Sequence, residues 1–242
     1  MSGMDPRPAV IGRRLQQVDR LLAVGGGKGG IGKSLVAATS ALMLARAGRR
    51  VGLLDLDFTG PCDHLILGLD DRFPAEPFGI EPPLLHGVRF MSVVYFIRDH
   101  PAPLRGEDLT NALLELLSIT VWKELDTLII DMPPGLGDTT LDTVRLLPRA
   151  EHLLISTPQQ VVVETVRRTL RFHVGLKSPV AGVLENMQAN GSERVRRLAE
   201  EFALPYLGAI PLDPSIETAL GDAQRLAATP AARALGSIVE RL

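Results

Sequence analysis

The sequence predicts an α/β protein with a doubly wound, mostly parallel sheet that is flanked by helices. Short apolar runs bounded by Gly, Pro or Asp alternate along the chain with longer segments of helical period, which is typical of strand–helix–strand units. The apolar runs show little alternation between apolar and polar residues. Strands of this kind are expected where helices cover both faces of a sheet.

The elements follow one another in a regular order. Strand candidates are apolar runs closed by turn-forming residues, and they lie at residues 21–24, 51–55, 88–93, 127–131, 152–156, 180–185 and 206–210. Helix candidates carry apolar residues at helical spacing, and they lie at residues 33–47, 106–120, 139–147, 161–174, 192–202, 214–221 and 230–241.

The chain is long enough for one large domain with a buried core. Of its 242 residues, 45% are apolar and 22% charged, which excludes disordered and collagen-like classes. No linker rich in Gly, Ser or Pro divides it, so residues 21–242 are expected to form one domain. Residues 1–20 are expected to form a polar lead segment with one helical turn around residues 11–18. Four prolines between residues 70 and 85 predict a surface excursion.

Charge and cysteine content narrow the class of protein. The chain has 26 basic and 28 acidic side chains, a net charge of -2, so no overall positive field indicates nucleic-acid binding. The single cysteine, Cys62, excludes an intramolecular disulfide framework and favours a reducing, cytoplasmic setting. There is no apolar run of about 18 residues and no apolar core of a signal peptide near the first residues.

The glycine-rich segment after the first strand candidate predicts a phosphate site. Residues 27–34 match G-x-x-x-x-G-K-[ST] between a strand and a helix, where the backbone N–H groups and the helix N-terminus cradle phosphates. Lys33 is expected to reach the β- and γ-phosphates and Ser34 to bind Mg²⁺. The predicted nucleotide-binding residues of this loop are Gly27, Lys28, Gly29, Gly30, Ile31, Gly32, Lys33 and Ser34.

A dinucleotide fingerprint, G-x-G-x-x-G, is the weaker alternative for the same glycines. Gly25, Gly27 and Gly30 satisfy its spacing, and Asp55 ends the next strand candidate, where such a site needs an acid. That site has no use for the pair formed by Lys33 and Ser34, so the phosphate loop is preferred.

Beyond the loop, the sequence resembles the MinD, ParA and NifH superfamily of P-loop proteins (the SIMIBI type), and within it the Mrp group. The extra lysine in KGGIGKS resembles their deviant phosphate loop. Further similar segments are LLDLDFTGPCDHLILGL (residues 53–69), LIIDMPPGLGD (128–138), GVLENM (182–187) and LGAIPLD (207–213). The resemblance implies ATP and Mg²⁺ as ligands.

Three carboxylates end strand candidates or follow them closely. Asp131 ends an apolar strand and is expected to hold Mg²⁺ through water. The resemblance implies that Asp57 positions or deprotonates the attacking water and that Asp55 supports the Mg²⁺ shell. The alternative is that Asp55 and Asp57 only cap the turn after their strand.

Other site residues come from the resemblance. It implies that Lys28 reaches the nucleotide of a second subunit in an ATP-dependent homodimer, so Lys28, Lys33 and Asp57 are the expected catalytic residues. A second switch is expected at Pro133, Pro134 and Gly135, while Gly137 and Asp138 are assigned to capping the next helix. Asn186 is expected to read the adenine edge, although an asparagine there is also an ordinary turn former. The predicted base-lining residues are Pro211, Leu212 and Asp213.

The sequence departs from the Mrp pattern in its cysteines. Members that carry iron–sulfur clusters have C-x-x-C shortly after the NM segment, whereas MQANGSERVRRLAEE contains no cysteine. One cysteine per subunit cannot supply the four thiolates of a bridging cluster, so the cluster is not expected from these residues. Cys62, Asp63 and His64 offer a thiolate, a carboxylate and an imidazole, and two copies facing across a dimer could hold a cargo metal through Cys62; the alternative is that Cys62 is a small buried apolar residue.

The sequence therefore predicts a slow, partner-stimulated ATPase that works as a nucleotide-gated homodimer and carries a metal or iron–sulfur cargo for an unknown client. A ParA-like or MinD-like positioning switch is the alternative. The missing C-x-x-C favours this alternative, whereas the acidic net charge opposes DNA binding. PAARALGSIVERL at the C-terminus lacks lysine and aromatic residues, so packing on the sheet is preferred to membrane anchoring. Solvated helix faces are the preferred explanation for the arginines of residues 164–172 and 192–198.

Overall fold

The structure is a computed structural model of the chain, and it describes residues 5–69, 73–76, 79–97, 106–189 and 191–242. One sheet of eight strands in the order β3-β4-β2-β5-β1-β6-β7-β8 forms its centre. Every neighbouring pair is parallel except the edge pair of β3 and β4. The strands are β1 Val18–Gly26, β2 Val51–Asp55, β3 Leu84–Leu85, β4 Val88–Ser92, β5 Leu125–Asp131, β6 Glu151–Ser156, β7 Val180–Gln188 and β8 Tyr206–Pro211. The predicted fold class is confirmed.

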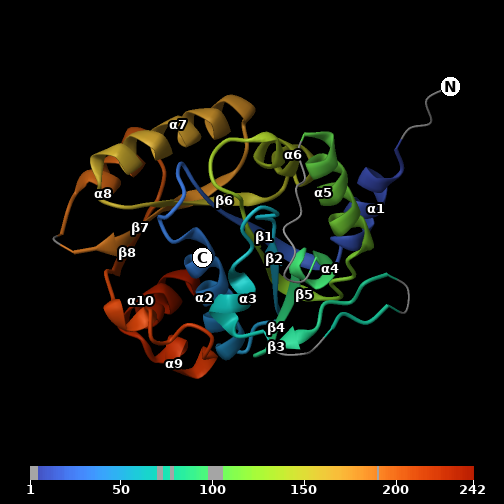
Figure 1. The fold of residues 1–242 in the computed structure, drawn as a ribbon. Helices are drawn as coiled ribbons and strands as arrows, with labels where there is room; N and C mark the ends of the chain where they lie inside the picture. The colour runs from blue at the N-terminus through green and yellow to red at the C-terminus, as the bar shows by residue number, and fades with distance from the viewer. Residues whose placement is uncertain (1–4, 70–72, 77–78, 98–105, 190) are drawn as a thin grey trace.

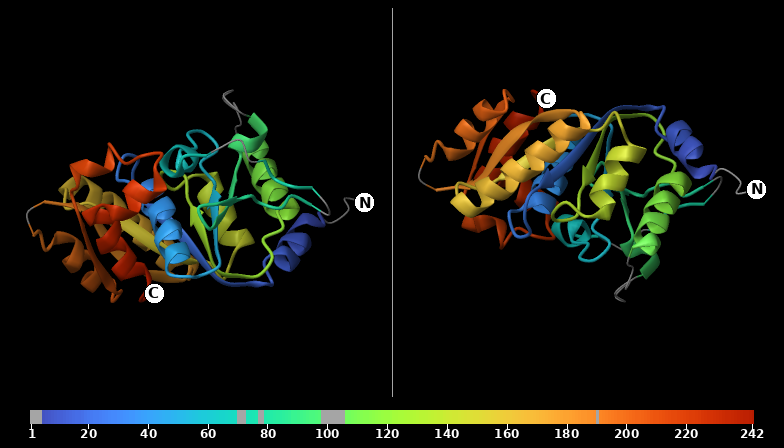
Figure 2. Two further views of the ribbon diagram at one scale, coloured as in Figure 1. Left: turned by 90° about the horizontal axis from the view of Figure 1, so that it is seen from below. Right: turned by 90° about the horizontal axis from the view of Figure 1, so that it is seen from above.

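Helices cover both faces of the sheet. Figure 1 and the two views in Figure 2 show α7 and α8 on the face opposite to α2, α9 and α10. The helical segments are α1 Arg7–Arg14, α2 Lys33–Arg46, α3 Asp63–Leu67, α4 Val94–Ile97, α5 Glu107–Ile119, α6 Asp138–Leu146, α7 Gln160–Leu176, α8 Arg194–Glu201, η1 Pro214–Ile216, α9 Ala223–Ala228 and α10 Pro230–Val239. Burial on both faces explains why the apolar runs of β2 and β6 lack alternation.

The beginning of the chain differs from the expected lead segment. Its helix is α1, Arg7–Arg14, which begins four residues before the expected turn at 11–18 and ends within it, and it packs against α5. The first strand begins at Val18 rather than at residue 21, because Val18 is buried and pairs with Leu125 of β5. Segment 18–20 is therefore part of the sheet.

The segment after β8 also differs from the predicted helix at 214–221. Only Pro214–Ile216 is helical there, as a single 3₁₀ turn, and the chain then turns at Gly221, where φ is +79°. Asp222 starts a separate helix, α9, because its side chain accepts hydrogen bonds from the N–H groups of Gln224 and Arg225. The sequence analysis did not predict α3, α4, α9 or the short strand β3.

The proline-rich excursion expected at residues 70–85 lies partly outside the described residues. In its described part, Ala75 pairs with Glu81 in an antiparallel bridge. The N–H of Ile80 donates to the carbonyl of Ile119, and the N–H of Val121 donates to the carbonyl of Ile80. The excursion is thereby attached to the end of α5 beside the sheet.

The C-terminal helix α10 packs beside the sheet, as predicted from its composition. It contacts α2 and β8, and its buried side chains include Leu235, Ile238 and Val239. No helix among the described residues combines the length and apolar character needed to cross a membrane.

The arginines of α7 and α8 make internal contacts. Arg167 forms ion pairs with Glu164 of its own helix and with Glu201 of α8. The guanidinium of Arg196 lies over the ring of Tyr206, 4.4 Å from its centroid. These contacts fit helix surfaces that stabilise the fold.

Two buried histidines stack between β6 and α7. The ring centroids of His152 and His173 are 4.1 Å apart, and both residues are at most 2% exposed. Nε2 of His152 and Nδ1 of His173 have no hydrogen-bond partner among the described residues. Burial, followed by the charge of His173, lowers the pKa of His152 to about 3, and burial lowers the pKa of His173 to about 4. Both rings are therefore neutral in the folded protein near pH 7.

This pair predicts an acid-sensitive stability. Because both pKa values are lowered on folding, its stabilisation is complete above about pH 6.5 and is lost as the pH falls towards 4. We expect a loss of about 2 kcal/mol of unfolding free energy for each histidine between pH 7 and pH 5. Urea unfolding of the wild type and of a His152→Leu, His173→Leu variant at both pH values measures the difference. The exposed His86→Asn is the control, and an identical pH dependence in all three proteins would disprove the assignment.

Candidate nucleotide and cation site

The phosphate loop joins the central strand to the helix behind it. β1 ends at Gly26, the loop spans residues 27–32, and α2 begins at Lys33. Among the described residues, none of the backbone N–H groups of residues 28–32 donates a hydrogen bond to the rest of the chain. The loop therefore presents free donors at the N-terminus of a helix, which is the arrangement that binds phosphate.

Close packing holds this loop in place. The side-chain amide of Asn186 donates to the carbonyl of Ile31 at 2.9 Å, and Asn186 is 4% exposed. Gly32 has a φ of +83°, and a Cβ there would lie 2.4 Å from Nδ2 of Asn186. A Cβ on Gly27 would lie 2.4 Å from the backbone of Thr165 in α7. These positions need glycine because neighbouring groups approach the loop closely.

The two lysines of the loop lie in different environments. Lys33 is 7% exposed, and its Nζ lies 3.5 Å from the carbonyl of Lys28, under the loop. Lys28 itself is exposed. The loop therefore carries one buried and one exposed ammonium, and the separate roles predicted for them stay predictions.

Two of the predicted carboxylates meet at the carboxyl edge of the sheet. Asp55 ends β2 and Asp131 ends β5, and the two residues are paired directly in the parallel register. Both are at most 1% exposed. Asp55 accepts hydrogen bonds from the N–H of Asp57 at 3.0 Å and from Oγ of Ser92 at 3.3 Å. Parallel pairing places both side chains on one face, so they lie together beside the loop.

Burial makes this carboxylate pair hard to ionise. It raises the pKa of Asp55 to about 7, with the neighbouring Asp57 adding to the rise. It raises the pKa of Asp131 to about 8, which the hydroxyl of Ser34 and the charge of Lys33 partly oppose. Both oxygens of Asp131 lack a hydrogen-bond partner among the described residues. Carboxylates in this state fit a magnesium ion, which would hold them in the charged form.

A cleft of about 390 Å³ lies over the loop, and Asp57 and part of the predicted second switch line it. Asp57 lines it, and one oxygen of Asp57 accepts hydrogen bonds from the N–H groups of Thr59 and Gly60 and from the Thr59 hydroxyl. Pro134 lines the same cleft. Gly135 has a φ of +83°, and Gly137 is the N-cap of α6, as predicted.

Cys62 also lines this cleft, between Asp57 and α3. It is partly buried and unpaired with any other cysteine. Burial raises the pKa of its thiol, with the nearby carboxylates adding to the rise. A thiol of this kind stays protonated at neutral pH unless a metal ion replaces the proton.

The segment predicted to line the base, residues 211–213, connects β8 to the helices that follow it. One oxygen of Asp213 accepts from the N–H and the hydroxyl of Ser215, and the other accepts from the N–H of Ala231. Pro211 and Leu212 are exposed at the end of β8. The cleft is instead lined by the residues that follow: Ile216, Glu217 and Leu220. Contact of Pro211, Leu212 and Asp213 with a nucleotide stays a prediction.

One buried residue of the site was considered from the sequence only as part of the candidate cargo-metal segment Cys62-Asp63-His64, not as a partner of Asp55 and Asp131. Asp63, the first residue of α3, lies beside Asp55 and Asp131 and is fully buried. In the sequence it is only an acid between Cys62 and His64. Since α3 itself was not predicted, no local signal indicated that Asp63 turns inward.

A phosphate loop on a doubly wound parallel sheet, with buried carboxylates at the ends of neighbouring strands, defines a P-loop NTPase fold and site. Residues 17–242 match the ParA family described as the NUBPL iron-transfer P-loop NTPase, and the chain belongs to this family.

Relatives agree with this assignment. The chain is 34% identical over 214 residues to the iron–sulfur cluster carrier protein of Salmonella typhimurium, a match that covers 82% of this chain and 58% of that protein. The chain thus spans about three fifths of the length of that relative. The resemblance to the Mrp group drawn from the loop and the later motifs is confirmed.

Solved structures show the same fold. The nucleotide-binding protein of Archaeoglobus fulgidus, solved with ADP and with cobalt found by PIXE, has a TM-score of 0.76 and 29% identity, covering 90% of this chain and 92% of that one. The septum site-determining protein MinD of Pyrococcus horikoshii, solved with Mg-ADP, has a TM-score of 0.70 and 22% identity, covering 92% and 95%.

The bond from Asn186 to the loop predicts the effect of its removal. In Asn186→Ala the carbonyl of Ile31 loses its donor, so we expect binding of ATP and of inorganic triphosphate to weaken together, by about tenfold. Triphosphate has no base, so a loss confined to ATP would show that Asn186 reads adenine instead. Calorimetric titration with both ligands gives the answer, and Asn111→Ala on α5 is the control.

Proposed function

We propose that this chain is a Mg²⁺-dependent ATPase that acts as a nucleotide-gated homodimer and carries a metal or iron–sulfur cargo to a client in the cytoplasm. The observation that supports it most is the pairing of buried Asp55 with buried Asp131 at the phosphate loop, where the charge of buried Lys33 acts on Asp131. This set supplies charge for both the phosphates and the metal ion of a phosphoryl transfer. The names of the relatives support the cargo.

Each residue has a defined part in the proposed reaction. The loop N–H groups and Lys33 bind the phosphates, and Ser34, Asp55 and Asp131 hold Mg²⁺, partly through water. The ion supplies charge neutralisation at the phosphates. Asp57, with one oxygen already held by its own turn, orients the water that attacks the terminal phosphorus and takes up its proton. The products are ADP and phosphate.

The dimer is proposed from the position of Lys28. Its side chain is exposed, whereas the second lysine of the loop, Lys33, is buried with its Nζ 3.5 Å from the carbonyl of Lys28. Lys28 can therefore reach the phosphates of a facing subunit, so that ATP joins the two copies. Turnover is slow until a client or activating protein completes the switches at Asp57 and at Pro133, Pro134 and Gly135.

Variants of Asp57 and Lys33 test the reaction. We expect Asp57→Ala to bind ATP as the wild type does, because the phosphate loop is unchanged. Its rate of ATP hydrolysis should fall by about 100-fold or more, because the attacking water loses its partner. The trapped ATP complex should elute as a dimer in size-exclusion chromatography. We expect Lys33→Ala to lose ATP binding. Wild-type turnover in Asp57→Ala would refute the role of that residue.

Lys28→Ala tests the dimer with the same assays. It should bind ATP and remain a monomer, because the phosphate loop keeps Lys33. An ATP-dependent dimer of Lys28→Ala would exclude the contact across subunits.

The cargo is tested by metal and sulfide analysis of protein purified without oxygen. Cys62 is the single thiol in the sequence, and its place in the cleft would link a bound metal to the nucleotide state. We expect metal in fixed proportion to the wild-type protein and its loss in Cys62→Ser, with ATP binding unchanged. Metal retained by Cys62→Ser, or a metal-free wild type, would remove Cys62 as the cargo ligand.

A further inference from the structure

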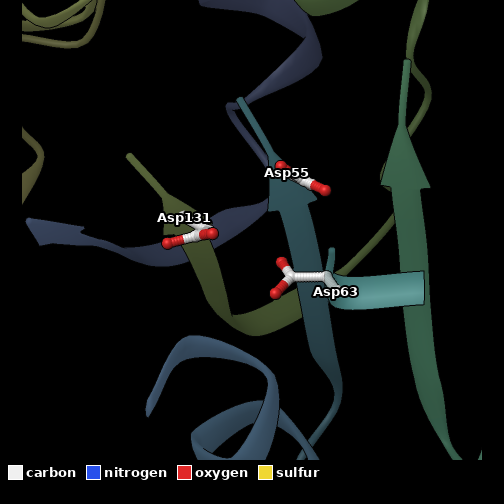
Figure 3. Close-up of side chains that lie close together, drawn as sticks. All are labelled: Asp55, Asp63 and Asp131. Carbon is white, nitrogen blue, oxygen red and sulfur yellow. The ribbon is translucent and has the colours of Figure 1, made fainter. Parts of the chain in front are cut away.

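Asp63 brings a third buried carboxylate to the edge of the sheet. One oxygen from each of Asp55, Asp63 and Asp131 lies within 4.8 Å of the others. Figure 3 shows the side chain of Asp63 extending from the start of α3 towards the strand end that carries Asp131. All three residues are at most 1% exposed, so water screens their charges weakly.

Two of these carboxylates lack any partner within the described part of the chain. Neither oxygen of Asp63 and neither oxygen of Asp131 takes part in a hydrogen bond there. Asp55 differs, because both of its oxygens accept bonds. Buried carboxylates are normally paired, hydrogen-bonded or bound to a metal. The four unpartnered oxygens are therefore available to bind a ligand.

The surrounding charges favour a cation. Burial has the largest effect on the pKa of Asp63, followed by the charges of Asp131 and Asp55. All three raise this pKa. Lys33 is the cation that acts on Asp131. The acids around Asp63 outnumber this one cation, so the space between them attracts a positive ion.

The spacing and chemistry indicate which cation fits. Oxygens bind Mg²⁺ at about 2.0–2.1 Å and Ca²⁺ at about 2.3–2.6 Å, so opposite ligands lie about 4–5 Å apart. The separation of up to 4.8 Å is of this size. An all-oxygen donor set favours Mg²⁺, Mn²⁺ or Ca²⁺ over the softer metals that select thiolates.

We propose that Asp55, Asp63 and Asp131 form a protein-only site for a divalent cation of the magnesium type, which is filled before a nucleotide enters the cleft. The proposed function places Mg²⁺ beside Asp55 and Asp131 for the reaction of ATP, and this inference rests on that function for the location alone. A cation held first would keep the buried acids ionised and ready for the phosphates.

Manganese binding without nucleotide tests this site. Mn²⁺ is titrated into EDTA-treated full-length protein, and the sharp electron paramagnetic resonance signal of free Mn²⁺ reports what remains unbound. We expect one Mn²⁺ per wild-type chain, displaced by excess Mg²⁺. We expect Asp63→Asn, which keeps the shape and removes the charge, to weaken binding by about tenfold or more. The exposed Glu200→Gln is the matched control and should bind as the wild type.

Thermal unfolding and ATP binding separate a failure of this inference from a failure of the proposed function. Asp63→Asn should unfold in EDTA at the wild-type temperature or above it, and Mn²⁺ should raise the unfolding temperature of the wild type and of Glu200→Gln more than that of Asp63→Asn. Wild-type Mn²⁺ affinity in Asp63→Asn, or no binding to the wild type without nucleotide, would overturn the site. ATP binding in EDTA is measured separately. Protein that binds ATP but not Mn²⁺ refutes this inference alone, and protein that binds Mn²⁺ but not ATP refutes the proposed function alone.

Discussion

Burial of negative charge at the carboxyl edge of the sheet is the constraint on which the site depends. β2 and β5 pair in register, so Asp55 and Asp131 are held side by side with almost no contact with solvent. Such an arrangement is unfavourable without a compensating charge. The buried ammonium of Lys33 supplies part of the compensating positive charge. A cation bound at this edge would supply the rest. The chemistry of the site thus follows from how two strands pair.

The phosphate loop is likewise held from outside its own sequence. Its carbonyl at Ile31 is bound by Asn186 from β7, and Gly27 lies against the backbone of α7. Strands β6 and β7 and helix α7 therefore support a loop that belongs to β1 and α2. This side of the sheet supports the phosphate loop through an amide side chain and backbone contacts rather than through a charged side chain.

Residues with proposed parts in ATP hydrolysis and in cargo binding line one cleft. Asp57, Cys62 and Pro134 line the same space above the loop. A change in the nucleotide would therefore be felt by the thiol and by both switches together. The relatives named as iron–sulfur cluster carriers share this fold, whereas the segment after β7 in this chain offers no thiol. Any metal carried by this chain would be linked to the nucleotide through the cleft itself.

The sequence by itself determined the parts that depend on local pattern. Apolar runs of strand length placed most of the sheet, and the spacing of residues 27–34 identified the phosphate loop between strand and helix. Asp55 and Asp131 could be predicted because each ends such a run. Local hydrogen bonding and periodicity act over a few residues, so they are visible in sequence.

Tertiary structure alone decided the contacts between distant segments. It turned Asp63 inward beside Asp131, 68 positions further along the chain, and it joined Asn186 to Ile31. It also directed one oxygen of Asp213 to the N–H of Ala231 and stacked His152 on His173. Each of these depends on how helices pack against a sheet whose strand order differs from the chain order. Spacing along the chain carries no record of that packing.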